Sequence, residues 1–163
     1  MIIFLRHGEA ENNVKKILAG RTPGINLTEQ GKQQAEQAGE MIKSLDISTI
    51  YSSPIDRAMQ TAEIVGKHCD VKPISDDRLI ELDMGKFTMV PYTEIFKNHG
   101  NVFLKFYEGS LEISHNGVES FTEVQKRVFD IVDFVKNKHK GENVVLVTHM
   151  DPIKAMIGKV LSL

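Results

Sequence analysis

The apolar and polar residues of this sequence follow a pattern that predicts strands alternating with helices. Residues 1–5 and the VVLV of NVVLVTH (143–149) are apolar without alternation, which is typical of strands buried on both faces. A third short strand is predicted for STIYSS, residues 48–53. We therefore expect an α/β fold, a three-layer sandwich with a mostly parallel central sheet flanked by helices.

Capping signals and the helical spacing of apolar residues predict the helices between these strands. Thr28 is typical of a helix N-cap, and residues 29–45 after it have a helix-forming composition. Ser53 is predicted to cap a second helix that starts at Pro54, since proline lacks the N–H group that would be unpaired there. Apolar residues form one face of a long helix over residues 121–135, and a closing helix follows NVVLVTH.

Composition and charge narrow the class of protein without changing this picture. At 163 residues the chain is long enough for one compact core, so we expect a single domain over residues 1–163. The net charge is −2 with mixed signs, and no apolar run is long enough to cross a bilayer, so neither nucleic acid nor a membrane is expected as a partner. The single cysteine, Cys69, excludes an internal disulfide and fits a reducing, cytoplasmic location. The composition gives no indication of oligomeric state.

Polar residues that can bind phosphate follow three of the predicted strands. Arg6 and His7 come directly after the first strand, residues 52–57 follow the second, and His149 follows the last. Ligands of open α/β sheets bind beyond the carboxyl ends of the strands, and the helix that begins near Arg57 offers unpaired N–H groups to an anion. The sequence therefore predicts a pocket in which guanidinium and imidazole groups converge on a phosphate.

Other chemistries are less well supported by the sequence. A lone histidine after a strand is usually structural, and His7 and His149 differ because both follow apolar strands and precede turn residues. A metal site is the competing interpretation, but the H-x-x-x-H and H-E-x-x-H spacings are absent. Helix capping explains Ser53 without a nucleophilic role, and no P-loop is present.

Six blocks of the sequence, in order, resemble those of the histidine phosphatase superfamily, the phosphoglycerate-mutase-like proteins. They are LRHGEAENN, LAGRTPGINLTEQGKQQA, IYSSPIDRAMQTAEIV, LIELDMGKF, GVES and VLVTHMDPIK. The resemblance covers nearly the whole chain and implies a mostly parallel sheet flanked by helices. It also implies that the protein needs no metal and no organic cofactor.

The resemblance assigns catalytic roles to five residues. His7 would be the nucleophile that takes up a phosphoryl group, Glu81 would be the proton donor, and the phosphate pocket would be formed by Arg6, Arg57 and His149. The chemistry fits these residue types, because neighbouring guanidinium groups lower the pKa of an imidazole and so favour its nucleophilic neutral form. Partial burial and a nearby phosphate raise the pKa of a carboxyl group, as a proton donor requires.

Four further residues are expected to bind the substrate, a small phosphorylated metabolite. They are Gly8, Asn13, Arg21 and Thr22. Asn13 matches the family position that usually adds a hydrogen bond to the phosphate, and Arg21 and Thr22 belong to the loop that commonly borders the substrate.

The sequence departs from the family pattern in two places. Phosphatases of the family often carry an acidic residue and a glycine where this chain has Thr88 and Met89, which leaves the far wall of the pocket open to question. The sequence also ends at Leu163, soon after the helix that follows His149, whereas many relatives continue with a further strand and tail. We expect either a short member of the family or a chain truncated at its C-terminus.

The compact stretch between Glu81 and His149 and the segment PYTEI favour a phosphatase that hydrolyses small phosphomonoesters. A cofactor-dependent phosphoglycerate mutase, which shares the phosphohistidine step, is the first alternative. The second is a catalytically silent relative that binds phosphorylated ligands.

Overall fold

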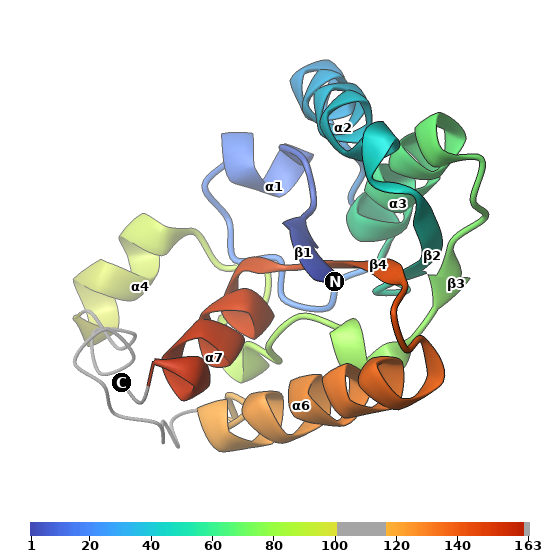
Figure 1. The fold of residues 1–163 in the computed structure, drawn as a ribbon. Helices are drawn as coiled ribbons and strands as arrows, with labels where there is room; N and C mark the ends of the chain where they lie inside the picture. The colour runs from blue at the N-terminus through green and yellow to red at the C-terminus, as the bar shows by residue number, and fades with distance from the viewer. Residues whose placement is uncertain (101–116, 162–163) are drawn as a thin grey trace.

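A parallel sheet of four strands forms the centre of the computed structural model, which describes residues 1–100 and 117–161 (Figure 1). The strand order is β1-β4-β2-β3, and the end of the chain at Leu163 lies outside the described residues. The strands are β1 (Ile2–Arg6), β2 (Ile47–Ser52), β3 (Ile74–Ser75) and β4 (Asn143–Thr148). Every pairing between them is parallel, as the sequence predicts.

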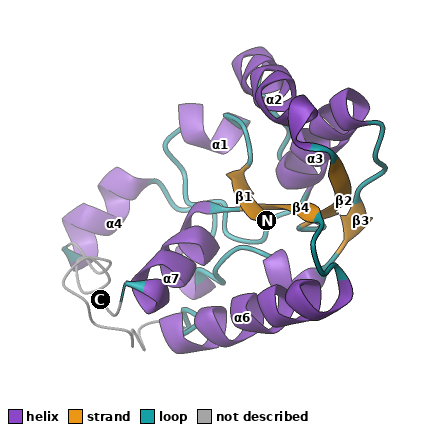
Figure 2. Ribbon diagram, in the orientation of Figure 1, coloured by secondary structure: helices purple, strands orange, loops and turns teal. Residues whose placement is uncertain are grey.

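Helices cover both faces of this sheet (Figures 1 and 2). The chain places α2 and α3 on one face and α6 and α7 on the other, and their bounds are α2 Glu29–Ile42, α3 Asp56–Cys69, α6 Phe121–Lys138 and α7 Met150–Val160. Alternate residues of β4 enter the two cores, since Val145 and Val147 pack with α3 whereas Val144 and Leu146 pack with α6. The predicted three-layer α/β sandwich is confirmed.

The first strand differs from its prediction. Residues 2–5 are half-buried rather than buried, because β1 lies at the edge of the described sheet and pairs with β4 alone. The prediction is correct for β4, whose last five residues are all buried.

The helix starts show one success and one error of the sequence analysis. Thr28 caps α2, since its side chain accepts a hydrogen bond from the N–H of Gly31. The prediction that Ser53 caps α3 is wrong, because that helix begins at Asp56 after Ile55. The hydroxyl of Ser53 instead forms a turn with the N–H of Ile55 and a contact with His149.

Besides the two-residue strand β3, two short α-helices of the described chain were not predicted. They are α1 (Glu11–Val14) and α4 (Tyr92–His99), and both lie at the end of the molecule where β1 ends (Figure 1). Among the described helices none is long and apolar enough to cross a membrane.

Candidate active site

The carboxyl ends of β1, β4 and β2 bring three distant segments together. The N–H of His7 donates to the carbonyl of Thr148 over 3.0 Å, which continues the parallel pairing one residue beyond β1. The N–H of Ser53 donates to Val147 over 2.9 Å on the other side of β4. The residues that follow each strand therefore meet at one edge of the sheet, as predicted.

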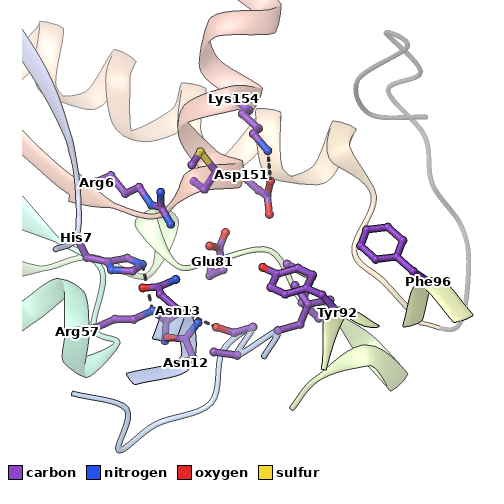
Figure 3. Close-up of a pocket in the computed structure, with 15 residues that line it drawn as sticks. Arg6, His7, Asn12, Asn13, Arg57, Glu81, Tyr92, Phe96, Asp151 and Lys154 are labelled. Atoms are coloured by element: carbon purple, nitrogen blue, oxygen red, sulfur yellow. Dashed lines mark hydrogen bonds and ion pairs between the residues drawn. The ribbon is translucent and has the colours of Figure 1, made fainter. Parts of the chain in front are cut away.

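A cavity of about 430 Å³ opens at this edge (Figure 3). Four of the five predicted catalytic residues line it, namely Arg6, His7, Arg57 and Glu81. The fifth, His149, is fully buried, and its ring contacts that of His7 edge-on with 5.1 Å between the centroids. Segments far apart in the sequence thus place two guanidinium groups, one imidazole and a carboxyl group around one space, with the ring of His149 packed against that of His7.

The hydrogen bonds of His7 define its tautomer. Its Nδ1 lies 2.7 Å from the carbonyl of Gly8, which can only accept a hydrogen bond, so Nδ1 carries the proton. Its Nε2 accepts a hydrogen bond from Nε of Arg57 over 3.2 Å. Since a guanidinium group can only donate, Nε2 carries the lone pair. The imidazole is therefore neutral and orientated by both of its nitrogens.

The environment of His7 keeps the ring in this neutral form. Burial lowers its pKa to about 4, and the positive charges of Arg57 and Arg6 add to that effect. The hydrogen bond to Gly8 opposes the shift only in part. The predicted effect of the two arginines has the expected direction, but burial is the larger cause.

Arg57 is buried at the start of α3 and connects His7 to the loop before α2. Its Nη2 donates to the carbonyl of Gly20 over 2.8 Å, whereas Nη1 has no partner among the described residues. His149 shows a similar arrangement, because its Nε2 contacts the hydroxyl of Ser53 at 2.8 Å and its buried Nδ1 has no hydrogen-bond partner in the described part of the chain. Buried polar atoms normally have partners, so these two atoms indicate a site for a ligand with acceptor oxygens.

Burial lowers the pKa of His149 well below its usual value, followed by the charge of Arg57. In the absence of an anion His149 is therefore neutral. A bound phosphate would favour its protonated form, since a nearby negative charge raises the pKa of an imidazole.

Glu81 lines the cavity together with His7, and Figure 3 shows its carboxyl group between the His7 side of the cavity and Tyr92. Burial raises its pKa to about 8, and the negative charge of Asp151 contributes in the same direction. One carboxyl oxygen accepts a hydrogen bond from the N–H of Leu82 over 2.8 Å, and the other lies 4.0 Å from Nδ1 of His149. The raised pKa favours the protonated carboxyl group, which is the form that can donate a proton.

The predicted substrate-binding residues occupy different places. Asn13 lines the cavity, and its Oδ1 accepts a hydrogen bond from the N–H of Ala10. Gly8 does not line it, and a Cβ atom at this position would lie 2.3 Å from the carbonyl oxygen of Gly31, so Gly8 permits close packing against α2. Ala19 and Gly20 line the cavity from the predicted loop.

Arg21 and Thr22, the other two predicted residues of that loop, are not among the cavity-lining residues. Arg21 instead points to the backbone of Glu81, and its Nε donates to that carbonyl over 2.9 Å. The N–H of Thr22 donates to the carbonyl of Ala19 over 3.0 Å.

The two departures from the family pattern lie beside the cavity rather than in it. Met89 adopts a left-handed backbone conformation with φ of 64°, which glycine adopts without strain. Its N–H donates to the carbonyl of Leu18, a cavity-lining residue. Thr88 is not among the residues that line the cavity.

Five polar or aromatic residues that line the cavity were not predicted from the sequence: Asn12, Tyr92, Phe96, Asp151 and Lys154. Asn12 adjoins the predicted Asn13, so its position carried a signal. An aspartate in the first turn of a helix, such as Asp151 in α7, is usually explained by the helix dipole. Tyr92 and Phe96 belong to α4, whose place beside the cavity depends on tertiary structure.

Within residues 1–100 and 117–161 no group of three or more histidine, cysteine, aspartate or glutamate side chains is arranged to bind a metal ion.

Comparison with known proteins agrees with this geometry. The chain is 37% identical over 163 residues to the 2,3-bisphosphoglycerate-dependent phosphoglycerate mutase of Thermoplasma acidophilum, covering 99% of this chain and 76% of that protein. It is 30% identical over 158 residues to phosphoserine phosphatase 1 of Hydrogenobacter thermophilus, covering 95% and 73%. A mycobacterial glucosyl-3-phosphoglycerate phosphatase in complex with VO3 superimposes with a TM-score of 0.90 at 26% identity, covering 99% and 80%. The sequence model of the histidine phosphatase superfamily (branch 1) matches residues 2–163, so the chain belongs to this family.

Proposed function

We propose that this protein is a phosphatase that hydrolyses small phosphomonoesters through a phosphohistidine on His7. The observation that carries the proposal is the neutral His7, whose Nδ1 donates to Gly8 and whose Nε2 lone pair is orientated by Arg57. An imidazole is a nucleophile only when neutral, and most surface histidines would be partly protonated near neutral pH. Here burial and two guanidinium groups remove that limitation.

The first step transfers the phosphoryl group to His7. The ester phosphate binds to Arg6 and Arg57. Its oxygens compete with Nε2 of His7 for the N–H group of Arg57. The freed lone pair attacks phosphorus as the bond to the ester oxygen breaks. Glu81 donates its proton to that leaving oxygen, and the protonated His149 balances charge on the phosphate.

The second step hydrolyses the phosphohistidine. Once the alcohol has left, Glu81 is ionised and accepts a proton from water as that water attacks phosphorus. The bond between phosphorus and Nε2 breaks, inorganic phosphate leaves, and His7 and Glu81 return to their starting protonation states.

The cavity beyond the phosphate site has room for an organic leaving group. Tyr92 and Phe96 of α4 form one wall and are 38% and 47% exposed (Figure 3). Asp151 and Lys154 of α7, paired over 3.5 Å, form another. The substrate class is therefore a phosphomonoester of a small organic alcohol, in agreement with the phosphatases among the relatives.

Phosphoglycerate mutase activity is the second candidate, and the observation in its favour is the 37% identity to the Thermoplasma mutase. A mutase passes the phosphoryl group from the histidine to a phosphoglycerate instead of water. Both activities thus share the first step and differ in the acceptor.

Two assays separate the candidates. The protein is first incubated, with and without EDTA, with a panel of phosphomonoesters, and released phosphate is measured. It is then incubated with 3-phosphoglycerate and a trace of 2,3-bisphosphoglycerate. We expect EDTA-insensitive phosphate release and little 2-phosphoglycerate. Efficient isomerisation without phosphate release would contradict the phosphatase assignment, and metal-reversible inhibition by EDTA would contradict the metal-independent mechanism.

A further inference from the structure

The segment that carries Glu81 leaves a short 3-10 helix (Asp77–Leu79) and continues without helix or strand, yet its backbone carbonyls are paired. The carbonyls of the four consecutive residues 78–81 each accept a hydrogen bond from a side chain. Thr148 donates to Leu79 over 2.6 Å, and Arg127 of α6 donates to the carbonyls on both sides of it. Since buried backbone groups need partners, these side chains replace the ladder of hydrogen bonds that a strand would provide.

Two guanidinium groups meet at the carbonyl of Glu81. Nε of Arg21 donates to it over 2.9 Å and Nη2 of Arg127 over 3.2 Å. The carboxylate of Glu119 bridges the two arginines, at 2.9 Å from Nη2 of Arg21 and 3.1 Å from Nε of Arg127. The side chains of Arg127 and Glu119 are only 15% and 13% exposed, so water competes little for these contacts. We call Arg21, Glu119 and Arg127 the arginine–glutamate clamp.

The backbone of the clamp is fixed as well. The N–H of Glu119 donates to the carbonyl of Asp83 over 2.9 Å, and the N–H of Asp83 donates to the Glu119 carboxylate over 3.2 Å. The next residue, Ser120, forms a capping box with Glu123 at the start of α6. The chain that follows Glu81 is therefore attached, through Asp83 and Glu119, to the start of the long helix α6.

We propose that the arginine–glutamate clamp positions the carboxyl group of Glu81 for proton donation, an inference that rests on the proposed role of Glu81 as the acid. The hydrogen bonds of the clamp go to the backbone of Glu81 and not to its carboxyl group, so they act through position. The charge of Arg127 also lowers the pKa of that carboxyl group, and Arg127→Lys keeps this charge while it removes the planar contacts. Arg127 uses three nitrogens for its contacts with three carbonyls and Glu119. A lysine has one nitrogen and cannot reproduce this planar fork.

The test compares two substrates in single turnover. Benzyl phosphate releases an alkoxide that needs a proton, whereas p-nitrophenyl phosphate releases a phenolate that leaves without one. In Arg127→Lys we expect phosphoenzyme formation from benzyl phosphate to slow by about tenfold to hundredfold, because a displaced acid transfers its proton poorly. With p-nitrophenyl phosphate the rate should change by less than about threefold. Arg21→Met should show the same selectivity at a smaller size.

Controls make each outcome decisive. Arg78→Met removes an arginine of the same segment that pairs with Asp76 and stacks on Phe134, and should leave both rates nearly unchanged. Equal slowing on both substrates in Arg127→Lys, or no slowing, would overturn the positioning role. If Arg127→Lys does not fold, Arg21→Met on the more exposed side of the clamp decides instead.

The variant Glu81→Gln separates this inference from the proposed function. Selectivity for benzyl phosphate in Glu81→Gln but in neither clamp variant would refute the clamp alone. Absence of selectivity in Glu81→Gln itself would refute the acid role, and with it the clamp.

Discussion

Nε of Arg57 donates a hydrogen bond to Nε2 of His7 over 3.2 Å, so one guanidinium group both orientates the lone pair and disfavours its protonation. The two effects are separable in principle but coincide here because Arg57 is buried against the ring. A ligand that draws Arg57 toward its own oxygens would expose a lone pair that is already correctly directed.

The pH dependence of kcat/KM for benzyl phosphate should be bell-shaped. His7 must be neutral, so activity should rise as the pH increases through about 4, and Glu81 must be protonated, so it should fall as the pH increases through about 8. The phosphate group of the substrate itself ionises with a pKa of about 6, so the profile has to be corrected for this ionisation. Glu81→Gln should lose the alkaline limb, and an unchanged limb would exclude Glu81 as its source.

Glu81→Gln should slow phosphoenzyme formation from benzyl phosphate by about 10²–10⁴-fold, the usual contribution of a general acid. Formation from p-nitrophenyl phosphate should change far less, since its leaving group is stable as an anion. Single-turnover rates are required, because Glu81 also acts in the common second step. Equal losses on both substrates would mean that Glu81 shapes the pocket, and Glu9 and Asp83 would then be tested as the acid.

The raised pKa of Glu81 also predicts an effect on stability. The folded protein retains a proton that the unfolded chain loses above pH 4.5, so this stabilisation is fully present below 4.5 and is lost as the pH rises to about 8. The unfolding temperature of Glu81→Gln, relative to wild type, should therefore increase between pH 5 and pH 8. Glu94→Gln provides the matched control, because it replaces an exposed carboxyl group that does not line the cavity. A constant difference for Glu81→Gln would contradict the raised pKa.

The left-handed conformation of Met89 predicts that glycine is favoured at this position. A side chain at φ of 64° costs about 1–2 kcal/mol, and the half-exposed Met89 side chain contributes little packing in return. The free energy of unfolding, measured by denaturant titration, should be higher for Met89→Gly than for Met89→Ala by about 1 kcal/mol, since alanine retains the strained Cβ. Alanine equal to or better than glycine would show that the conformation carries no strain.

The sequence predicted the features that depend on local apolar pattern and on the residues that follow each strand, namely the buried strand β4 and the meeting of His7 and His149. The proximity of His7 and His149 could be predicted because each residue follows an apolar strand, and parallel strands end at the same edge of the sheet. The half-buried state of β1 could not be read in this way, since its apolar residues resemble those of a central strand and only the pairing order reveals an edge.

Contacts between distant loops were beyond the sequence. Arg21 was expected to bind substrate, but its side chain lies against the carbonyl of Glu81 and the carboxylate of Glu119, 98 residues away. The aromatic wall of the cavity depends on how α4 packs, which no periodicity indicates. Residue types at strand ends therefore predicted which side chains meet at the cavity better than they predicted the loops around it.

The phosphoenzyme is the most direct test of the account. Wild type quenched in alkali during turnover of p-nitrophenyl phosphate should carry up to one acid-labile phosphoryl group per chain, and peptide mapping should locate it on His7. His7→Ala should fold, bind phosphate and form no phosphoenzyme. A phosphoryl group on another residue, or undiminished turnover by His7→Ala, would contradict the proposal that His7 is the nucleophile.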